Sequence, residues 1–173
     1  MDKKDFNISI IRPEMRFEDF KWRGEGRSAE ELKGIKRGLR TLQTLETMAV
    51  NIYKFQITRR PNERNLYLLA AMGNEMTHLQ DFQLKLFEYG FKPSKFRILY
   101  WIVGAAVGII SRALGPRAIL KTGIWVEKKA VRHYAELLRN IKWDLQTRRI
   151  IEKDQADEKG HIDRWKEFLK KSG

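Results

Sequence analysis

Two short stretches of the chain share one pattern. Residues 74–79 read Asn-Glu-Met-Thr-His-Leu, and residues 157–162 read Asp-Glu-Lys-Gly-His-Ile. In both, a glutamate precedes a histidine by three positions, and the chain has only three histidines in all. Residues three apart lie on one face of an α-helix, about 5–6 Å apart at Cβ, so both side chains can reach one metal ion. The repeated Glu-x-x-His pattern therefore predicts metal ligands on two helices.

A second pair of matching stretches lies upstream of the first. Residues 46–53 and 127–134 share Glu, Ala, Val and Tyr at the same four positions. Each stretch opens with a glutamate that precedes the glutamate of a Glu-x-x-His by 29 or 31 residues. This internal repeat predicts two helical hairpins, each with one Glu followed by one Glu-x-x-His. The six predicted metal ligands are Glu46, Glu75, His78, Glu127, Glu158 and His161.

This set of ligands is typical of di-iron carboxylate bundles, in which two helices each provide a Glu and two others each provide Glu-x-x-His. Four carboxylates and two imidazoles suit two iron ions, because the negative ligands offset the charge of the cluster. Manganese is the nearest alternative, since hard oxygen ligands suit it as well. We expect no catalytic residue outside the metal centre.

Three further side chains are candidates for supporting the metal ligands. Tyr53 and Tyr134 each follow the first glutamate of their half by seven residues, on the same helix face, so one interpretation is that they hydrogen-bond ligands. Both also suit an ordinary core. His133 has no glutamate three positions before it. It is either a supporting or redox-relay group or an ordinary surface histidine.

Apolar residues recur at helical intervals on both sides of these motifs. Long helices are expected over about 28–59, 62–90, 116–142 and 145–169. Residues 91–115 form a connection that contains an apolar helix of its own, and no alternating strand pattern of useful length is present. The sequence thus predicts an all-α fold, a ferritin-like four-helix bundle with an extra apolar helix between the second and third long helices. Residues 1–28 are expected to form an N-terminal lead-in, and residues 29–173 the bundle.

Composition limits the classes of protein to consider. The chain has 173 residues, of which 42% are hydrophobic and 33% charged, as in a folded single domain. The absence of cysteine excludes disulfides, thiolate zinc sites, iron–sulfur clusters and cysteine nucleophiles. The net charge of +13 favours an anionic partner. Nucleic acid is not expected, because the aromatic residues do not interleave with the basic ones.

The longest uncharged stretch, residues 98–111, favours a membrane surface as that partner. Fourteen residues at about 1.5 Å each cannot cross a hydrocarbon core of roughly 30 Å. However, between positions 85 and 121 there are seven basic residues and one acidic residue, and an apolar face rimmed by positive charge is typical of a helix that lies on anionic lipid. The expected membrane contacts are Ile98, Trp101, Ile102 and Ile109.

The same stretch has other interpretations. Gly104 and Gly108 also suit close packing between helices, so the helix could instead be buried under the bundle or form the interface of a homodimer. Residues 1–19 mix both signs of charge and lack the apolar stretch of a secretory signal. We therefore expect a cytoplasmic protein that associates peripherally with membranes.

Over about residues 45–165, the sequence resembles the demethoxyubiquinone hydroxylases, membrane-associated ferritin-like di-iron enzymes of quinone biosynthesis. The segments that carry the resemblance are Glu46-x-x-Ala49-x-Asn51-Ile52-Tyr53-x-x-Gln56, Glu75-x-x-His78-Leu79 with Phe82, Trp101 with Gly104, Gly108 and Leu114-Gly115, Val126-Glu127 with His133-Tyr134, and Asp157-Glu158-x-x-His161.

The resemblance implies two iron sites and a reaction. Glu46, Glu75 and His78 would hold one iron. Glu127, Glu158 and His161 would hold the other, with the glutamates of the two Glu-x-x-His motifs as bridges. The implied reaction is hydroxylation of a membrane-soluble quinone by dioxygen, with electrons from an external donor or from the reduced quinone itself. Two alternatives use the same residues: a rubrerythrin-like peroxide reductase or ferroxidase, and a non-catalytic membrane-surface protein with a structural metal.

Overall fold

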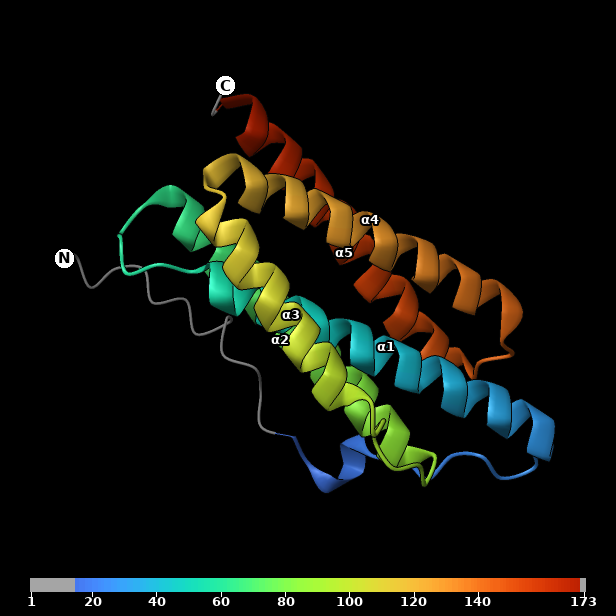
Figure 1. The fold of residues 1–173 in the computed structure, drawn as a ribbon. Helices are drawn as coiled ribbons and strands as arrows, with labels where there is room; N and C mark the ends of the chain where they lie inside the picture. The colour runs from blue at the N-terminus through green and yellow to red at the C-terminus, as the bar shows by residue number, and fades with distance from the viewer. Residues whose placement is uncertain (1–14, 172–173) are drawn as a thin grey trace.

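The computed structural model describes residues 15–171, and this part of the chain is helical without any strand (Figure 1). A short 3-10 turn, η2 (Phe17–Asp19), precedes five α-helices: α1 (Ala29–Gln56), α2 (Glu63–Glu88), α3 (Arg97–Ala113), α4 (Pro116–Asn140) and α5 (Leu145–Lys171). The four longer helices form a bundle, and α3 is the extra helix between α2 and α4. The predicted all-α class and the helix within the connection are confirmed.

Local sequence signals set the starts of the helices. At the start of α1, the Ser28 hydroxyl accepts a hydrogen bond from the Glu31 amide, and the Glu31 carboxylate accepts one from the Ser28 amide, both at 3.1 Å. This reciprocal pair satisfies two amides that have no partner within the helix. Asn62 caps α2 and Pro116 occupies the first turn of α4. The backbone therefore begins α1, α2 and α4 where the sequence signals predict.

Two glycines allow α3 to lie directly on α1. A Cβ atom added at Gly104 would be 2.5 Å from the carbonyl oxygen of Met48, and one added at Gly108 would be 2.6 Å from that of Ile52. No side chain fits at such distances unless a backbone moves. The close packing expected as one interpretation of these glycines is therefore present, and it occurs within the chain.

The opposite face of α3 is exposed. It carries Ile98, Leu99, Trp101, Ile102, Val103, Ile109 and Ile110, followed by Leu114 just past the end of the helix. We call these eight residues the outer face of α3. None of the described helices is long and apolar enough to cross a membrane.

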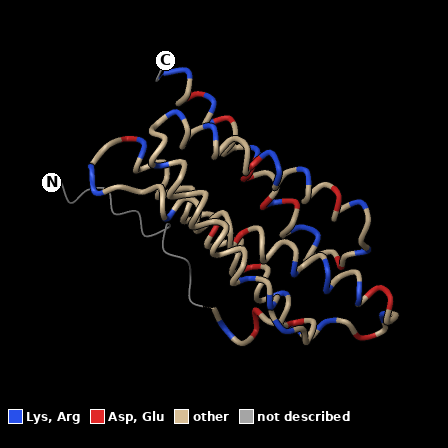
Figure 2. The backbone as a smooth tube through the Cα atoms, in the orientation of Figure 1, with Lys and Arg blue, Asp and Glu red and all other residues tan. Residues whose placement is uncertain are grey.

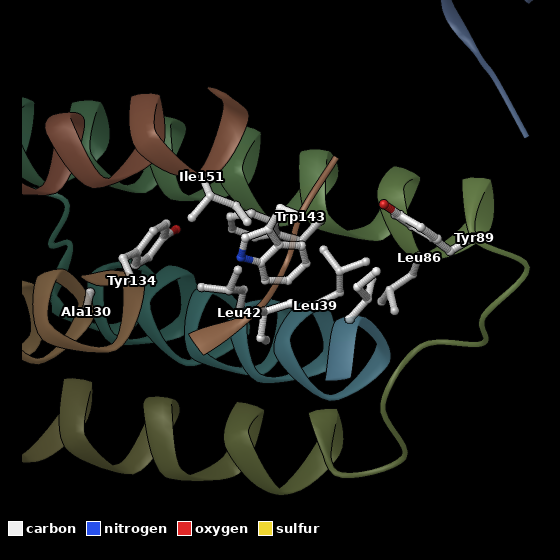
Figure 3. Packing of buried hydrophobic residues seen from close by; sticks show 11 residues of the cluster. Leu39, Leu42, Leu86, Tyr89, Ala130, Tyr134, Trp143 and Ile151 are labelled. Carbon is white, nitrogen blue, oxygen red and sulfur yellow. The ribbon is translucent and has the colours of Figure 1, made fainter. Parts of the chain in front are cut away.

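The apolar core has two main parts with a polar layer between them. One cluster includes Leu39, Leu42, Leu86, Tyr134, Trp143 and Ile151, whose side chains gather between the helices in Figure 3. The other includes Tyr53, Leu68, Leu120 and Trp165. Along each long helix, the predicted metal ligands come between residues of the first cluster and residues of the second. The fold therefore places the polar motifs between two apolar regions.

An ionic network attaches the described part of the lead-in to the bundle. Arg23 Nε lies 2.5 Å from Glu88 Oε2, and its Nη1 lies 2.7 Å from Asp144 Oδ1. The Tyr89 hydroxyl donates to the same Asp144 carboxylate at 2.5 Å, and Lys85 reaches Glu88 at 2.5 Å. These contacts join residues before α1 to the end of α2 and the start of α5. Residues 1–14 of the expected lead-in and 172–173 of the expected bundle lie outside the described residues, and the boundary at residue 28 stays a proposal.

Candidate metal centre

The structure brings the six predicted ligands together in the polar layer of the bundle. They come from four helices: Glu46 from α1, Glu75 and His78 from α2, Glu127 from α4, and Glu158 and His161 from α5. All six are buried, with at most 2% of any residue exposed. Such burial of four carboxylates is rare unless they are paired or coordinate a metal.

The ligands form two overlapping groups. In each group, one candidate ligand atom from every residue lies within 4.8 Å of the others. The first group is Glu46, Glu75, His78 and Glu158, and the second is Glu75, Glu127, Glu158 and His161. Each group thus contains one histidine and three carboxylates, and two of the carboxylates belong to both.

The shared glutamates each face both histidines. Glu75 places Oε2 3.7 Å from Nδ1 of His78 and Oε1 3.2 Å from Nδ1 of His161. Glu158 places Oε1 3.1 Å from Nδ1 of His78 and Oε2 3.3 Å from Nδ1 of His161. One oxygen of each carboxylate therefore points to each imidazole.

Several buried polar atoms of the cluster form no well-aligned hydrogen bond, although Nδ1 of each histidine lies 3.1–3.7 Å from carboxylate oxygens of Glu75 and Glu158. The atoms without such a bond are both carboxylate oxygens of Glu75 and of Glu158, Oε2 of Glu127, and Nδ1 of His78 and of His161. Buried polar atoms without partners cost free energy. Two cations would satisfy all of them, and this set of carboxylates and imidazoles suits iron or manganese. The residues present therefore fit a pair of metal ions.

The raised pKa values of Glu46, Glu127, His78 and His161 show that the buried polar layer favours bound positive charge. Burial, with the neighbouring charge of Glu75, raises the pKa of Glu46, and burial together with Glu158 raises that of Glu127 to about 8. Burial alone would lower the pKa of His78 and of His161, but the surrounding carboxylates outweigh it and raise them to about 12 and about 11. Cations, whether protons or metal ions, are therefore stabilised here.

Two buried tyrosines contact Glu46 and Glu127, the glutamates that each belong to only one ligand group. The Tyr53 hydroxyl donates to Oε1 of Glu127, and the Tyr134 hydroxyl donates to Oε1 of Glu46 at 2.6 Å. Each tyrosine thus contacts the glutamate of the opposite repeat. Each bond occupies one carboxylate oxygen of a candidate ligand, and a supporting role of these tyrosines at a metal stays a prediction.

Each histidine turns its second ring nitrogen toward the opposite repeat. Nε2 of His161 lies 3.1 Å from the side-chain amide of Asn74, and Nε2 of His78 lies 3.3 Å from Oδ2 of Asp157. Asn74 and Asp157 occupy the same position of the repeat, directly before the glutamate of Glu-x-x-His. Sequence analysis missed both roles, although this shared position was a signal that could have revealed them.

A further acidic residue, Asp154, makes the two halves different. Asp154 is buried, and its Oδ1 lies 3.7 Å from Nε2 of His78. Burial raises its pKa to about 6. The corresponding position in the first repeat is Ala71, so His78 faces two carboxylates where His161 faces one amide. No motif in the sequence pointed to Asp154.

Comparison with known proteins agrees with this geometry. Residues 33–170 match the family described as Ubiquinone biosynthesis protein COQ7. The chain belongs to the COQ7 family. This confirms the resemblance drawn from the motifs and the ferritin-like class of the helical bundle. The match includes all six residues of the buried cluster.

Relatives of the COQ7-family chain carry the name 3-demethoxyubiquinol 3-hydroxylase. The relative from Acidovorax sp. (strain JS42) is 32% identical over 120 residues, which is 67% of this chain and 58% of the relative. The relative from Legionella pneumophila (strain Lens) is 26% identical over 136 residues, 78% of this chain and 64% of the relative. The aligned part of this chain thus spans about three fifths of the length of each relative.

His133 lies apart from the cluster in this COQ7-family structure. Its side chain is 42% exposed, and its Nδ1 lies 3.6 Å from Oε2 of Glu136 on the same helix. No described contact links it to the six buried ligands. The structure therefore groups Tyr53 and Tyr134 with the candidate ligands but does not group His133 with them.

A cavity reaches the cluster from one side. It has a volume of about 330 Å³ and is lined by Tyr67, Ala70, Ala71, Asn74, His161, Arg164 and Trp165. The lining includes both His161 and the amide that holds its ring. A small molecule entering this cavity would therefore meet the second ligand group first.

Proposed function

We propose that this chain is a di-iron carboxylate monooxygenase that hydroxylates a membrane-soluble quinone, of the demethoxyubiquinone type, with dioxygen. The observation that carries the proposal is the pair of buried ligand groups that share Glu75 and Glu158. Membership of the COQ7 family and the hydroxylase name of its relatives support the substrate class.

The assignment of ligands follows the two groups. Glu46, Glu75 and His78 would hold one iron, and Glu127, Glu158 and His161 would hold the other, with Glu75 and Glu158 available to both. An iron pair supplies the redox chemistry for dioxygen, and manganese is the nearest substitute. In the overall reaction one oxygen atom enters the quinone ring and the other leaves as water, which requires two protons and two electrons from a donor outside the site.

The protein's own residues keep this centre in position. Tyr53 and Tyr134 donate hydrogen bonds to Glu127 and Glu46, respectively, and so hold one oxygen of each carboxylate. Asn74 and Asp157 fix the orientation of the two imidazoles. Water is largely excluded, because the ligands lie between two apolar clusters. The cavity beside His161 is our candidate route for a small reactant.

The outer face of α3 supports contact with a membrane. Trp101 and Ile102 are 44% and 52% exposed, and Ile98 and Ile109 are more than half exposed. A continuous apolar helix face of this kind is typical of helices that lie in the lipid interface. We propose that this face rests on anionic lipid, which would bring a lipid-dissolved quinone to the protein.

Metal analysis and product analysis together test the proposal. Full-length protein loaded with ferrous iron without oxygen should bind about two irons per chain. After addition of dioxygen, reductant and a demethoxyubiquinol analogue, mass spectrometry should find the hydroxylated ring. Glu75→Ala should lose both irons and the product, because Glu75 belongs to both groups. Glu136→Ala, which removes a half-exposed glutamate of α4, is the matched control and should keep both.

The alternatives give different results in the same assays. Faster turnover of peroxide than of dioxygen, with no hydroxylated quinone, would favour a rubrerythrin-like peroxide reductase. Two tightly bound metals with no turnover of either oxidant would favour a structural metal site in a membrane-binding protein. Full retention of iron in the Glu75 variant would refute the assignment of ligands itself.

A further inference from the structure

A second cavity, of about 810 Å³, lies where α1 ends and α2 begins. Its lining residues are Ile57, Thr58, Arg59, Arg60, Arg64 and Arg112. We call this cavity the arginine pocket. Four of its six residues are arginines and none is acidic. It shares no residue with the candidate metal centre or with the cavity beside His161.

Among the residues that the structure describes, no carboxylate forms a salt bridge with the four arginines of the pocket. Within residues 15–171, arginine forms salt bridges only at Arg23 and Arg148. In addition, Nε of Arg64 is buried and has no hydrogen-bond partner among the described residues. A buried guanidinium N–H without an acceptor costs free energy. The pocket therefore offers charge and a free donor to a ligand with negative oxygens.

The loop that carries two of these arginines is held in place by a buried asparagine. Nδ2 of Asn65 donates to the carbonyl oxygens of Thr58 at 2.8 Å and of Arg60 at 2.5 Å. Its Oδ1 accepts from the Thr58 amide at 3.2 Å. Because these bonds order the loop before any ligand arrives, binding need not supply the free energy for ordering it. In Figure 2, the turn between α1 and α2 carries Lys and Arg colour on both sides of one acidic residue.

The packing of α3 on α1 brings the fourth arginine to this loop. Gly108 lies against the Ile52 carbonyl, and about one turn further on Nε2 of Gln56 donates to the Ser111 hydroxyl at 2.8 Å. Arg112 follows at once, with Nη1 3.5 Å from the Ile57 carbonyl oxygen. The stretch from residue 57 to residue 64 and the end of α3, which are distant in the sequence, thus converge on one cavity. The amino terminus of α2, which carries the positive end of a 26-residue helix dipole, lies at the same place.

We propose that the arginine pocket binds a phosphate group. Guanidinium groups form paired hydrogen bonds to phosphate oxygens, and several arginines around one cavity match the charge and the planar geometry of such a ligand. Two sources could supply the group. One is the headgroup of an acidic phospholipid, because α3, with its exposed apolar face, ends beside Arg112. The other is a phosphate compound free in solution.

Binding of inorganic pyrophosphate to the full-length chain tests the pocket directly. Titration at physiological salt, followed by calorimetry and by NMR of the arginine Nε–H groups, should show saturable binding that shifts the Arg64 signal. The double variant Arg60→Gln/Arg112→Gln removes two exposed arginines of the pocket. It should weaken binding at least about tenfold for each charge-assisted bond lost. Arg64→Lys keeps the positive charge but loses the planar guanidinium that forms paired hydrogen bonds, so it should weaken pyrophosphate binding as well.

A matched control separates the pocket from the general charge of the protein. Arg132→Gln/Arg149→Gln removes two exposed arginines of other helices and therefore the same net charge. It should leave pyrophosphate binding within about twofold, since unpaired surface charges contribute little. Equal binding by the two double variants, or no saturable binding by the wild type, would overturn the proposal. Iron loading should be unchanged in both, because neither touches the candidate metal ligands, so a failure of the di-iron proposal would be seen separately.

Vesicles distinguish the two sources of phosphate. Wild type and both double variants are compared on phosphatidylcholine vesicles with and without phosphatidic acid. If the pocket holds a lipid headgroup, the Arg60/Arg112 variant should lose binding to the acidic vesicles relative to the Arg132/Arg149 control. If it holds a free phosphate compound, the two variants should bind vesicles equally and differ only with pyrophosphate. If the two double variants bind both pyrophosphate and acidic vesicles equally well, the arginine pocket is not a phosphate site.

Discussion

Replacing Gly108 with alanine is a direct test of how α3 is attached to the bundle. The added Cβ would lie 2.6 Å from the carbonyl oxygen of Ile52 and 2.9 Å from Cβ of Phe55. Tight contacts of a Cβ atom begin at about 3.4 Å, so the first contact is about 0.8 Å too short. Because the atom it meets belongs to the backbone of α1, no side-chain rotation relieves it, and α3 has to move away.

The expected loss of stability follows from two opposing effects. Overpacking of a close contact costs about 1–3 kcal/mol, and a clash with backbone belongs at the upper end of that range. Alanine favours the helix over glycine by about 1 kcal/mol, which offsets part of the cost. The net decrease in the free energy of unfolding should be about 2 kcal/mol. For a chain of this size, that lowers the melting temperature by roughly 4–8 °C.

Gly73→Ala provides the matched control. Gly73 lies in the interior of α2, is exposed, and has nothing within 4 Å of the position of an added Cβ. The same substitution should therefore stabilise the protein there, by up to about 1 kcal/mol. Thermal and urea unfolding followed by circular dichroism measure both variants. If Gly108→Ala proves as stable as the wild type, the close packing of α3 on α1 is refuted.

Three further predictions concern the site, the membrane and pH. Asp157→Asn should weaken the binding of one of two cobalt ions by about 10–100-fold, because it alters the partner of His78, and competition with a chelating dye should show the other ion unaffected. Trp101→Ser/Ile102→Ser should reduce binding to anionic vesicles without changing metal content, as measured by co-sedimentation. Burial would raise the pKa of Asp144, but hydrogen bonds from Thr147 and Tyr89 outweigh it and hold that pKa at about 2. A lowered pKa in the folded state stabilises the fold above the unfolded value near 3.8, so stability should fall between pH 4 and pH 2 in urea unfolding, and less so in Asp144→Asn.

Controls exist in the chain for these measurements. Leu66 and Leu145 are 67% and 65% exposed on other helices, so a double serine variant there removes similar apolar surface and should not affect vesicle binding. Unchanged cobalt affinity at both sites in the Asp157 variant would show that this carboxylate does not support His78. An acid transition identical in wild type and Asp144→Asn would assign the pH dependence to other carboxylates.

The candidate ligands could be selected from the sequence because their pattern is strictly local, and their role as metal ligands stays a prediction. Glu-x-x-His needs only the helical period to place two side chains on one face, and the internal repeat doubles the pattern. The structure brings these residues together with Tyr53 and Tyr134, which follow from the same repeat. Asp154 could not be found in this way, since its counterpart in the first repeat is Ala71. Its approach to His78 depends on how α5 packs against α2, which the helical period of either helix does not contain.

The limits of local patterns are also visible at the end of α1. Periodicity extended this helix to about residue 59, but it ends at Gln56. The following residues leave the helix to accept and donate hydrogen bonds with Asn65, which belongs to the next helix. The glycines of α3 show a different limit, because the sequence was compatible both with close packing of this helix and with its contact with a membrane surface. The structure packs one face of the helix and exposes the other, because a helix has room for both.

The two halves of the candidate centre have the same ligands but different surroundings, and this difference suggests a division of roles. His78 faces Asp157 and Asp154, whose negative charge strengthens an imidazole as a donor to a metal. His161 faces the neutral amide of Asn74 and lines the cavity. If the six candidate ligands hold metal as proposed, the repeat would provide two similar sites, whereas its flanking residues place more negative charge beside His78 and a cavity beside His161. The proposed dioxygen-dependent reaction on a bulky ring would need such an open side, and placing it at His161 would make Asn74, rather than Asp154 and Asp157, the neighbour of the incoming molecule.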